Sequence, residues 1–168
     1  MKIYKIMLLV SFLMLTQAGH AESAYANIGV GLLNTNNVDN VGVGPVFRLG
    51  YLFSGVSNSF GIEVEANPMR VDMKDDDNSY YHSDRDMGLT LASYLVYNFE
   101  IPDTKFTVRP KAGIIFPNLG DNVYKDSSGF GYGLNVIYNF KEELGLYIGY
   151  GSFGSSANQY SAGLEVLF

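Results

Sequence analysis

The segment from Met69 to Asp86 carries the densest set of groups that could do chemistry. It contains six Asp residues, and carboxylate oxygens of this kind suit Ca²⁺ or Mg²⁺. A calcium loop aligned on Asp75 would require Gly at its sixth position, where this chain has Tyr80. The segment therefore favours a solvated acidic loop, or one that bridges divalent ions loosely, over a dedicated metal site. No metal ligand and no cofactor is predicted.

Catalysis by this segment is not predicted either. His82 lies close in sequence to Ser79, Ser83 and Asp84, but a nucleophilic triad needs a rigid scaffold and an oxyanion hole. An acidic loop supplies neither, so no catalytic residue is assigned and the chain is expected not to be an enzyme. Exposed aromatic side chains often anchor partners. The candidates for contact at the surface are therefore Asp75, Asp76, Asp77, Tyr80, Tyr81 and Tyr124.

The first 21 residues read as a secretory signal peptide. Lys2 and Lys5 precede the apolar run Ile6 to Leu15, and small residues follow at Gly19 and Ala21. Cleavage near Ala21 would leave residues 22–168 as one domain. The formal charge would then change from −6 to −8, which argues against a nucleic-acid partner. The chain has no Cys, so neither disulfides nor thiolate metal sites can stabilise it.

Period-two alternation dominates the rest of the chain. Runs rich in Tyr, Phe, Val, Ile and Gly are separated by Asn, Asp, Ser and Gly clusters, which is typical of strands and turns. Most runs have about the 9–11 residues that a tilted strand needs to cross hydrocarbon. The expected strands are 24–33, 41–53, 60–68, 86–99, 106–116, 129–140, 144–153 and 159–168.

The two faces of these strands differ sharply. One parity class is bulky and apolar, and the other contains 15 of the 19 glycines. A soluble barrel with its apolar face inward would show the same period, but the lumen of an eight-strand barrel is too narrow for so many large side chains. The pattern predicts an all-β, eight-stranded antiparallel up-and-down transmembrane β-barrel with a Gly-rich, charge-containing lumen.

The lumenal class also holds the charged residues of the strands. Buried charges persist only when they are paired and hydrogen-bonded, so three basic and three acidic residues predict an ion network that plugs the barrel. Side chains solvated near the barrel ends are the alternative, because the register could slip at Pro45 or Pro110, which lack an N–H donor. The predicted network comprises Arg48, Glu63, Glu65, Arg109, Lys111 and Glu165.

Loop lengths and aromatic positions fit an outer-membrane orientation. With a periplasmic start, the outside connections (34–40, 69–85, 117–128, 154–158) are mostly longer than the inside ones (54–59, 100–105, 141–143). Aromatic residues gather at both strand ends, as interfacial belts do. The periplasmic set is Tyr51, Phe53, Phe60, Tyr97, Phe99, Phe106, Tyr138, Phe140 and Phe168, and the outer set is Phe116, Phe130, Tyr132, Tyr150 and Tyr160.

With these strands, "GYGLNVIYNF", "LGLYIGYG" and the ending "YSAGLEVLF", the chain resembles the small outer-membrane barrels: the outer membrane protein X and Ail type, the opacity proteins, and the membrane domain of outer membrane protein A. The ending is similar to the signal that the outer-membrane assembly machinery reads, through Ser161, Gly163, Val166 and Phe168. Replacing Phe168 is expected to impair insertion more than it destabilises the folded barrel.

The resemblance implies a location in the cell outer membrane of a Gram-negative bacterium and a non-enzymatic surface, structural or adhesion role through the loops at 69–85 and 117–128. The implied partners are outer-membrane lipid, lipopolysaccharide and the assembly machinery, with host or matrix surfaces as further candidates. The first alternative is a narrow, porin-like channel for small solutes. A barrel enzyme that modifies lipid A is the second, because one such type places its catalytic residues on outer loops.

Overall fold

The computed structural model describes residues 24–35, 41–53, 59–72, 85–118, 129–153 and 157–168, so the expected signal peptide lies outside the described residues. Every strand pairs antiparallel with its neighbours, and the described part contains no helix long and apolar enough to cross a membrane. The strands are β1 (Ala24–Thr35), β2 (Gly42–Leu52), β3 (Phe60–Asp72), β4 (Arg85–Tyr97), β5 (Phe99–Glu100), β6 (Phe106–Asn118), β7 (Gly129–Lys141), β8 (Leu144–Phe153) and β9 (Ala157–Leu167).

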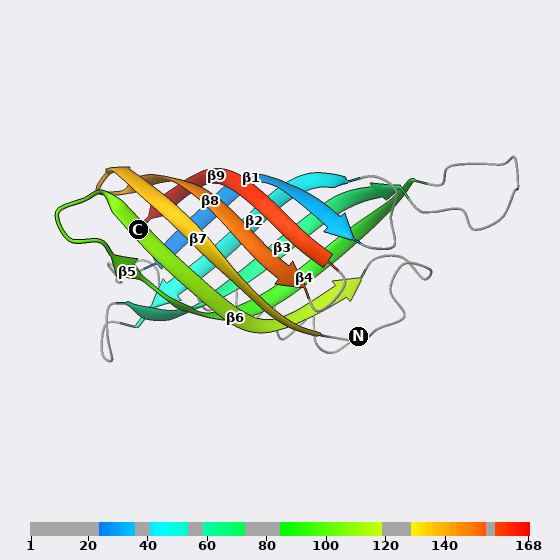
Figure 1. The fold of residues 1–168 in the computed structure, drawn as a ribbon, viewed down its shortest axis with the longest axis horizontal. Coiled ribbons are helices and arrows are strands. Elements are labelled where there is room, and N and C mark those ends of the chain that lie inside the picture. Colours follow the sequence, from blue (N-terminus) through cyan, green and yellow to red (C-terminus); the bar gives the residue numbers. More distant parts are fainter. Residues whose placement is uncertain (1–23, 36–40, 54–58, 73–84, 119–128, 154–156) are drawn as a thin grey trace, which may run out of the picture.

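These strands form a closed barrel of eight staves (Figure 1), which confirms the predicted fold class. β4 and β5 together make one stave, since both pair with β6 in the same register and only Asn98 separates them. The final pairing joins β9 to β1, and the Phe168 N–H donates to the Ala24 carbonyl oxygen at 2.8 Å. The strands that the structure describes therefore leave no free sheet edge.

The barrel is strongly sheared. Following paired residues once around the wall from Tyr25 leads back to β1 at Thr35, ten residues farther along. Shear and strand number together set the tilt and width of a barrel, and this one is narrow enough to be filled by side chains. The path passes through Gly50, Glu63, Tyr94, Gly113, Gly131, Phe153 and Ala157.

The prolines do not disturb the register. Val30 pairs with Pro45, and Leu134 pairs with Pro110, without a slip on either side. Between β2 and β3 the pairing stops after Phe47 and resumes at Val43 in the same register, so Pro45 lies opposite Pro68 in the interval. Neither proline can donate a hydrogen bond, which explains the interruption.

Five strand ends on the side predicted to face outward extend farther than predicted, namely those of β1, β3, β4, β6 and β9. β3 continues to Asp72 and pairs there with Arg85 of β4, while β6 continues to Asn118. The outer connections are therefore 73–84 and 119–128, not 69–85 and 117–128. Backbone hydrogen bonds form regardless of side-chain polarity, so the ladder extends beyond the apolar alternation from which the strand ends were predicted.

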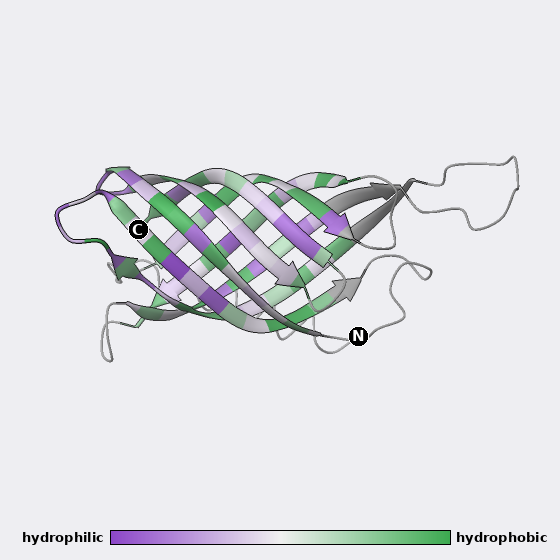
Figure 2. Cartoon of the chain, viewed as in Figure 1, coloured by the Kyte–Doolittle hydropathy of each residue, from purple (hydrophilic) through white to green (hydrophobic). Residues whose placement is uncertain are grey.

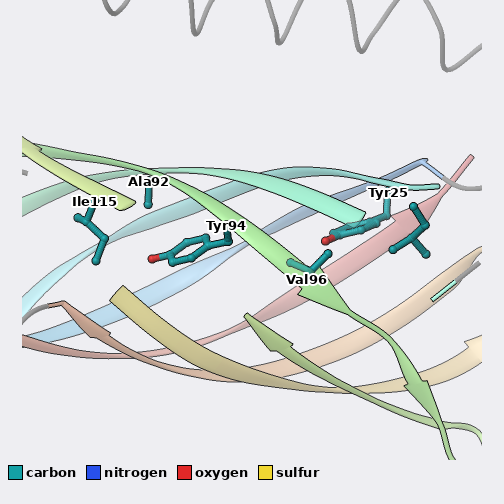
Figure 3. Close-up of a cluster of buried hydrophobic side chains, with 6 residues drawn as sticks. Tyr25, Ala92, Tyr94, Val96 and Ile115 are labelled. Carbon is teal, nitrogen blue, oxygen red and sulfur yellow. The ribbon is translucent and has the colours of Figure 1, made fainter. Parts of the chain in front are cut away.

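The two faces of the wall separate as predicted. Green and purple alternate along the strands (Figure 2), and the large apolar side chains of the predicted outer class are exposed, among them Val30, Phe130 and Ile148. Lumenal side chains are almost fully buried. A cluster of Tyr25, Leu52, Ala92, Tyr94, Val96 and Ile115 packs inside the barrel (Figure 3).

Candidate functional site

Six charged side chains project into the lumen from four staves. Strand alternation places them there, since each has the parity of the lumenal glycines on its own strand. At most 5% of the surface of any of them is exposed, so water cannot solvate their charges. They are Arg48 on β2, Glu63 and Glu65 on β3, Arg109 and Lys111 on β6, and Glu165 on β9.

Four of the six form a branched cluster, which comprises Arg48, Glu63, Glu65 and Lys111. The Glu65 carboxylate accepts from Arg48 Nε and Lys111 Nζ, each at 2.5 Å. The Glu63 carboxylate accepts from Lys111 Nζ at 2.9 Å and lies 3.8 Å from Arg48 Nε. Each carboxylate thus meets both cations, and the cluster ties β2, β3 and β6 together across the lumen.

The other two charges form a separate pair. Arg109 holds Glu165 through two parallel hydrogen bonds, at 2.5 Å from Nη1 and 3.0 Å from Nη2. The third nitrogen, Nε, donates to the Asn98 side-chain oxygen at 2.5 Å. Bidentate geometry makes this a strong, directional contact, and it links β6 to β9 on the opposite part of the wall.

Three buried tyrosines complete the site, and our sequence analysis missed them. The Arg109 guanidinium carbon lies 3.7 Å from the centre of the Tyr25 ring, and Lys111 Nζ lies 4.3 Å from that of Tyr94. Arg48 stacks similarly on Tyr147 at 4.8 Å. Between buried groups such as these, cation–π contacts are worth about 2 kcal/mol each. Parity alone could have found these tyrosines, because each shares the lumenal class of the glycines around it.

Glycine makes room for these rings. A Cβ atom on Gly50 would collide with the ring of Tyr25, which lies directly across the β1–β2 pair. On Gly29 it would collide with the Tyr147 hydroxyl and with the Ala162 carbonyl oxygen. The glycine-rich face therefore does not leave the lumen empty, since aromatic side chains from neighbouring strands occupy the space.

The network contains three positive and three negative side chains, but some polar atoms around it lack a hydrogen-bond partner. Tyr25 donates to Glu63 at 2.9 Å, Asn67 donates to Glu65 at 2.6 Å, and Ser161 accepts from Arg48 Nη2 at 2.8 Å. Several buried polar atoms have no partner, and a buried donor or acceptor left this way costs about 1–3 kcal/mol. They include Arg48 Nη1, the Tyr94 and Tyr147 hydroxyls, Gln159 Nε2, and both side-chain polar atoms of Asn27 and Asn135.

The C-terminal residues expected to act in assembly lie on both faces of β9. Ser161 is 8% exposed and faces the lumen, where it meets Arg48. A Cβ on Gly163 would collide with the backbone of Ile28 and Gly29, so only glycine fits the close β1–β9 approach there. Phe168 is 56% exposed at the rim. The expected surface contacts Asp75, Asp76, Asp77, Tyr80, Tyr81 and Tyr124 lie outside the described residues.

No family model matches this chain, and no curated protein matches it. Several solved structures of other proteins do match it. Outer membrane protein OprG from Pseudomonas aeruginosa is 14% identical, with 88% of this chain and 96% of that chain covered and a TM-score of 0.59. Neisserial surface protein A is also 14% identical, with 86% and 97% covered and a TM-score of 0.56. Ail, the attachment invasion locus protein of Yersinia pestis, is 14% identical, with 88% and 100% covered and a TM-score of 0.53.

These likenesses concern the fold. Each covers most of both chains, so the entire barrel is shared and not one hairpin of it. The resemblance to small eight-stranded outer-membrane barrels is thereby confirmed at the level of architecture. At this identity the comparison carries no residue roles.

Proposed function

We propose that this chain is an integral outer-membrane barrel whose lumen is closed, and that it acts without catalysis through its outer connections. In this role the barrel is a rigid anchor, and the segments 73–84 and 119–128 contact partners outside the cell. The partners proposed are outer-membrane lipid and lipopolysaccharide, and host or matrix surfaces.

The outer face supports the membrane location. Large apolar side chains are exposed around the barrel, and a monomer in water rarely exposes so large an apolar surface. Aromatic side chains also meet near the end of the barrel that holds the C-terminus. Tyr97 and Phe99 have ring centres 4.5 Å apart, and those of Phe106 and Tyr138 are 5.1 Å apart, as expected of an interfacial belt.

The closed lumen carries the functional part of the proposal. Two sets of ion pairs and three tyrosine rings cross the lumen, and the charged side chains are at most 5% exposed. Removing one partner of a buried ion pair costs about 3–5 kcal/mol, so opening a passage through these contacts would be expensive.

Planar-bilayer recording tests the closed lumen. We expect the folded barrel to give no steady open-channel current, and folding is checked first by the different gel mobility of boiled and unboiled protein. Steady currents that change when Arg109→Ala or Glu63→Gln is introduced would contradict the closed lumen. An unchanged mobility on boiling would contradict the membrane barrel itself.

A narrow channel is the second candidate, and one observation favours it. Polar side-chain atoms in the lumen lack a hydrogen-bond partner from the protein. They belong to Arg48, Asn27, Asn135 and Tyr147. Small solutes could hydrogen-bond there. The same recordings decide between the two candidates, because a channel would conduct in the wild-type protein.

The surface role is tested by replacing each outer connection separately. Exchange of residues 73–84 for a short Gly-Ser linker should abolish adhesion to cells or matrix while the barrel stays heat-modifiable. The matched exchange of 119–128 shows whether both connections contribute. Adhesion that survives both exchanges would contradict a role through these segments.

Recognition by the assembly machinery is proposed for the exposed end of β9. Phe168→Ala removes an aromatic ring that is 56% exposed, so the folded barrel should lose little stability. Insertion in cells should fall much more than the free energy of unfolding measured in vesicles. Equal losses in the two measurements would argue that Phe168 only stabilises the folded wall.

A further inference from the structure

A hollow of about 540 Å³ lies at the rim of the barrel, outside the lumenal site. It is formed by the turn between β5 and β6 and the turn between β7 and β8, which lie at the same end as the C-terminus (Figure 1). Volumes of this size are typical of small-ligand sites. Its walls carry charges of both signs: Lys105 and Lys141, and Glu100, Asp103 and Glu142.

A β-bulge presents Lys141 to this hollow. The β7–β8 register shifts between Asn139 and Lys141, so Lys141 pairs with Leu144 instead of continuing the lumenal parity of Asn139. Leu144 belongs to the outward class of β8, and the bulge therefore turns Lys141 to the outer face beside Phe140. Bulges commonly re-aim a side chain in this way, and they are frequent near functional sites.

Hydrogen bonds hold the two turns against each other. Asn139 N–H donates to the Lys105 carbonyl oxygen at 2.8 Å, and the Asn139 side chain donates to Thr107 at 3.1 Å. Within the first turn, Thr104 bonds to Ile101 through both its N–H and its hydroxyl. Asp103 takes a left-handed conformation with φ of 60°, which closes the turn. The hollow is thus held in shape before any ligand arrives.

The two turns show the same order of side-chain types, aromatic, then basic, then acidic, counted along the chain from the barrel wall toward the tip of the turn. The first runs from Phe106 through Lys105 and Thr104 to Asp103, and the second runs from Phe140 through Lys141 to Glu142. Both aromatic side chains are exposed on the outer face. An aromatic layer, then a cationic layer, then an acidic layer matches the depth profile of a zwitterionic lipid, in which the phosphate lies nearer the hydrocarbon than the ammonium group does.

We propose that this hollow binds the phosphoethanolamine headgroup of a phospholipid in the periplasmic leaflet. Lys105 and Lys141 contact the phosphate, and Asp103 and Glu142 receive the ammonium N–H donors, while the acyl chains lie along Phe106 and Phe140. This inference rests on the proposed membrane location, with the chain termini on the periplasmic side. Charge-assisted hydrogen bonds to both halves of the headgroup give selectivity for it over a purely anionic headgroup.

Native mass spectrometry of the barrel released from vesicles tests the proposal. The vesicles contain equal parts of phosphatidylethanolamine, phosphatidylglycerol and phosphatidylcholine. We expect phosphatidylethanolamine to be retained about fivefold more than either competitor, the size expected of one or two exposed ion pairs. Phosphatidylcholine has no N–H donor for the carboxylates, and phosphatidylglycerol has no cation at all.

Matched variants assign the two halves of the headgroup. Lys105→Gln with Lys141→Gln should abolish the enrichment, whereas Arg70→Gln with Arg85→Gln, an equal change of charge at the other end of the barrel on β3 and β4, should leave it intact. Asp103→Asn with Glu142→Gln should shift the preference to phosphatidylglycerol. Equal retention of all three lipids by the wild type would overturn the headgroup site while leaving the membrane barrel standing. Failure to insert into any of these vesicles would contradict the membrane location instead.

Discussion

The lumen contains two ion assemblies that are built on different plans. In the branched cluster, Glu65 meets both Arg48 and Lys111 at 2.5 Å, and Glu63 lies within 3.8 Å of the same two cations. In the pair, Arg109 and Glu165 have only each other as ion-pair partners within the part of the chain that the structure describes. Each charge of the cluster therefore has two oppositely charged neighbours, whereas each charge of the pair has one among the described residues.

This difference determines what a mutation exposes. A buried charge is costly only when nothing nearby compensates it. Loss of one carboxylate from the cluster leaves both cations beside the other carboxylate. Loss of Glu165 leaves Arg109 with a neutral amide and an aromatic face. Equal burial of the two assemblies therefore does not imply equal sensitivity.

Glu165→Gln is expected to have the largest effect. The change keeps the shape of the side chain and removes the charge opposite Arg109, so the free energy of unfolding should fall by about 3–5 kcal/mol. Equilibrium unfolding by urea of the barrel in phospholipid vesicles measures it. Glu143→Gln, on the exposed β7–β8 turn, is the control and should change little. A smaller loss of unfolding free energy for Glu165→Gln than for Glu63→Gln would invert the comparison.

Glu63→Gln is expected to cost less, about 2 kcal/mol, which is the size of one hydrogen bond to a charged group. Lys111 and Arg48 both retain Glu65 at 2.5 Å, and the new amide oxygen can still accept from Tyr25. The same urea titration measures the change. If Glu63→Gln destabilised the barrel as much as Glu165→Gln, sharing of cations within the cluster would not be protective.

Much of this arrangement was readable from residue parity. Strand alternation put Arg48 and Lys111 in one class with the glycines, and the narrowness of an eight-strand barrel put that class inside. Closure of the last strand on the first followed from the predicted membrane barrel, because an open sheet edge cannot be left in lipid. These inferences work because a strand has only two faces, and its side chains cannot choose between them independently.

The pairing of particular charges was not readable. Arg109 and Glu165 lie on staves that are not neighbours, and they meet only because the shear of the barrel brings those points to one depth. Shear is a property of all pairings together, and no local segment encodes it. The role of Asn98 was hidden for a related reason, since the expected strand 86–99 contains this residue but does not show which cation its amide meets.

The tyrosines give a smaller contrast between the two assemblies. Tyr25 donates its hydroxyl to Glu63, whereas the Tyr147 hydroxyl has no partner. Tyr25→Phe should therefore cost about 1 kcal/mol, and Tyr147→Phe should be neutral or slightly stabilising, since removing an unsatisfied buried group relieves its desolvation cost. Both variants keep the ring that faces the guanidinium. A larger loss from Tyr147→Phe than from Tyr25→Phe would indicate that the hydroxyl of Tyr147 has a partner other than protein.

The smallest net effect is expected when both members of the pair are removed together. Arg109→Met with Glu165→Leu replaces two opposed charges by apolar groups of similar volume, so no charge remains uncompensated and stability should stay within about 1 kcal/mol of the parent. Asn98 and the Tyr25 face lose their cation, which sets a small residual cost.

A double-mutant cycle in urea then gives the coupling energy between Arg109 and Glu165. Its magnitude should be at least about 5 kcal/mol, because each single change leaves one buried charge unpaired at a cost of about 3–5 kcal/mol and the double change costs at most about 1 kcal/mol. The corresponding cycle on Lys111→Met and Glu63→Leu should give a smaller coupling energy, because Glu65 and Arg48 remain to compensate each single change. Equal coupling in the two cycles would mean that the branched cluster is two independent pairs that happen to lie close together.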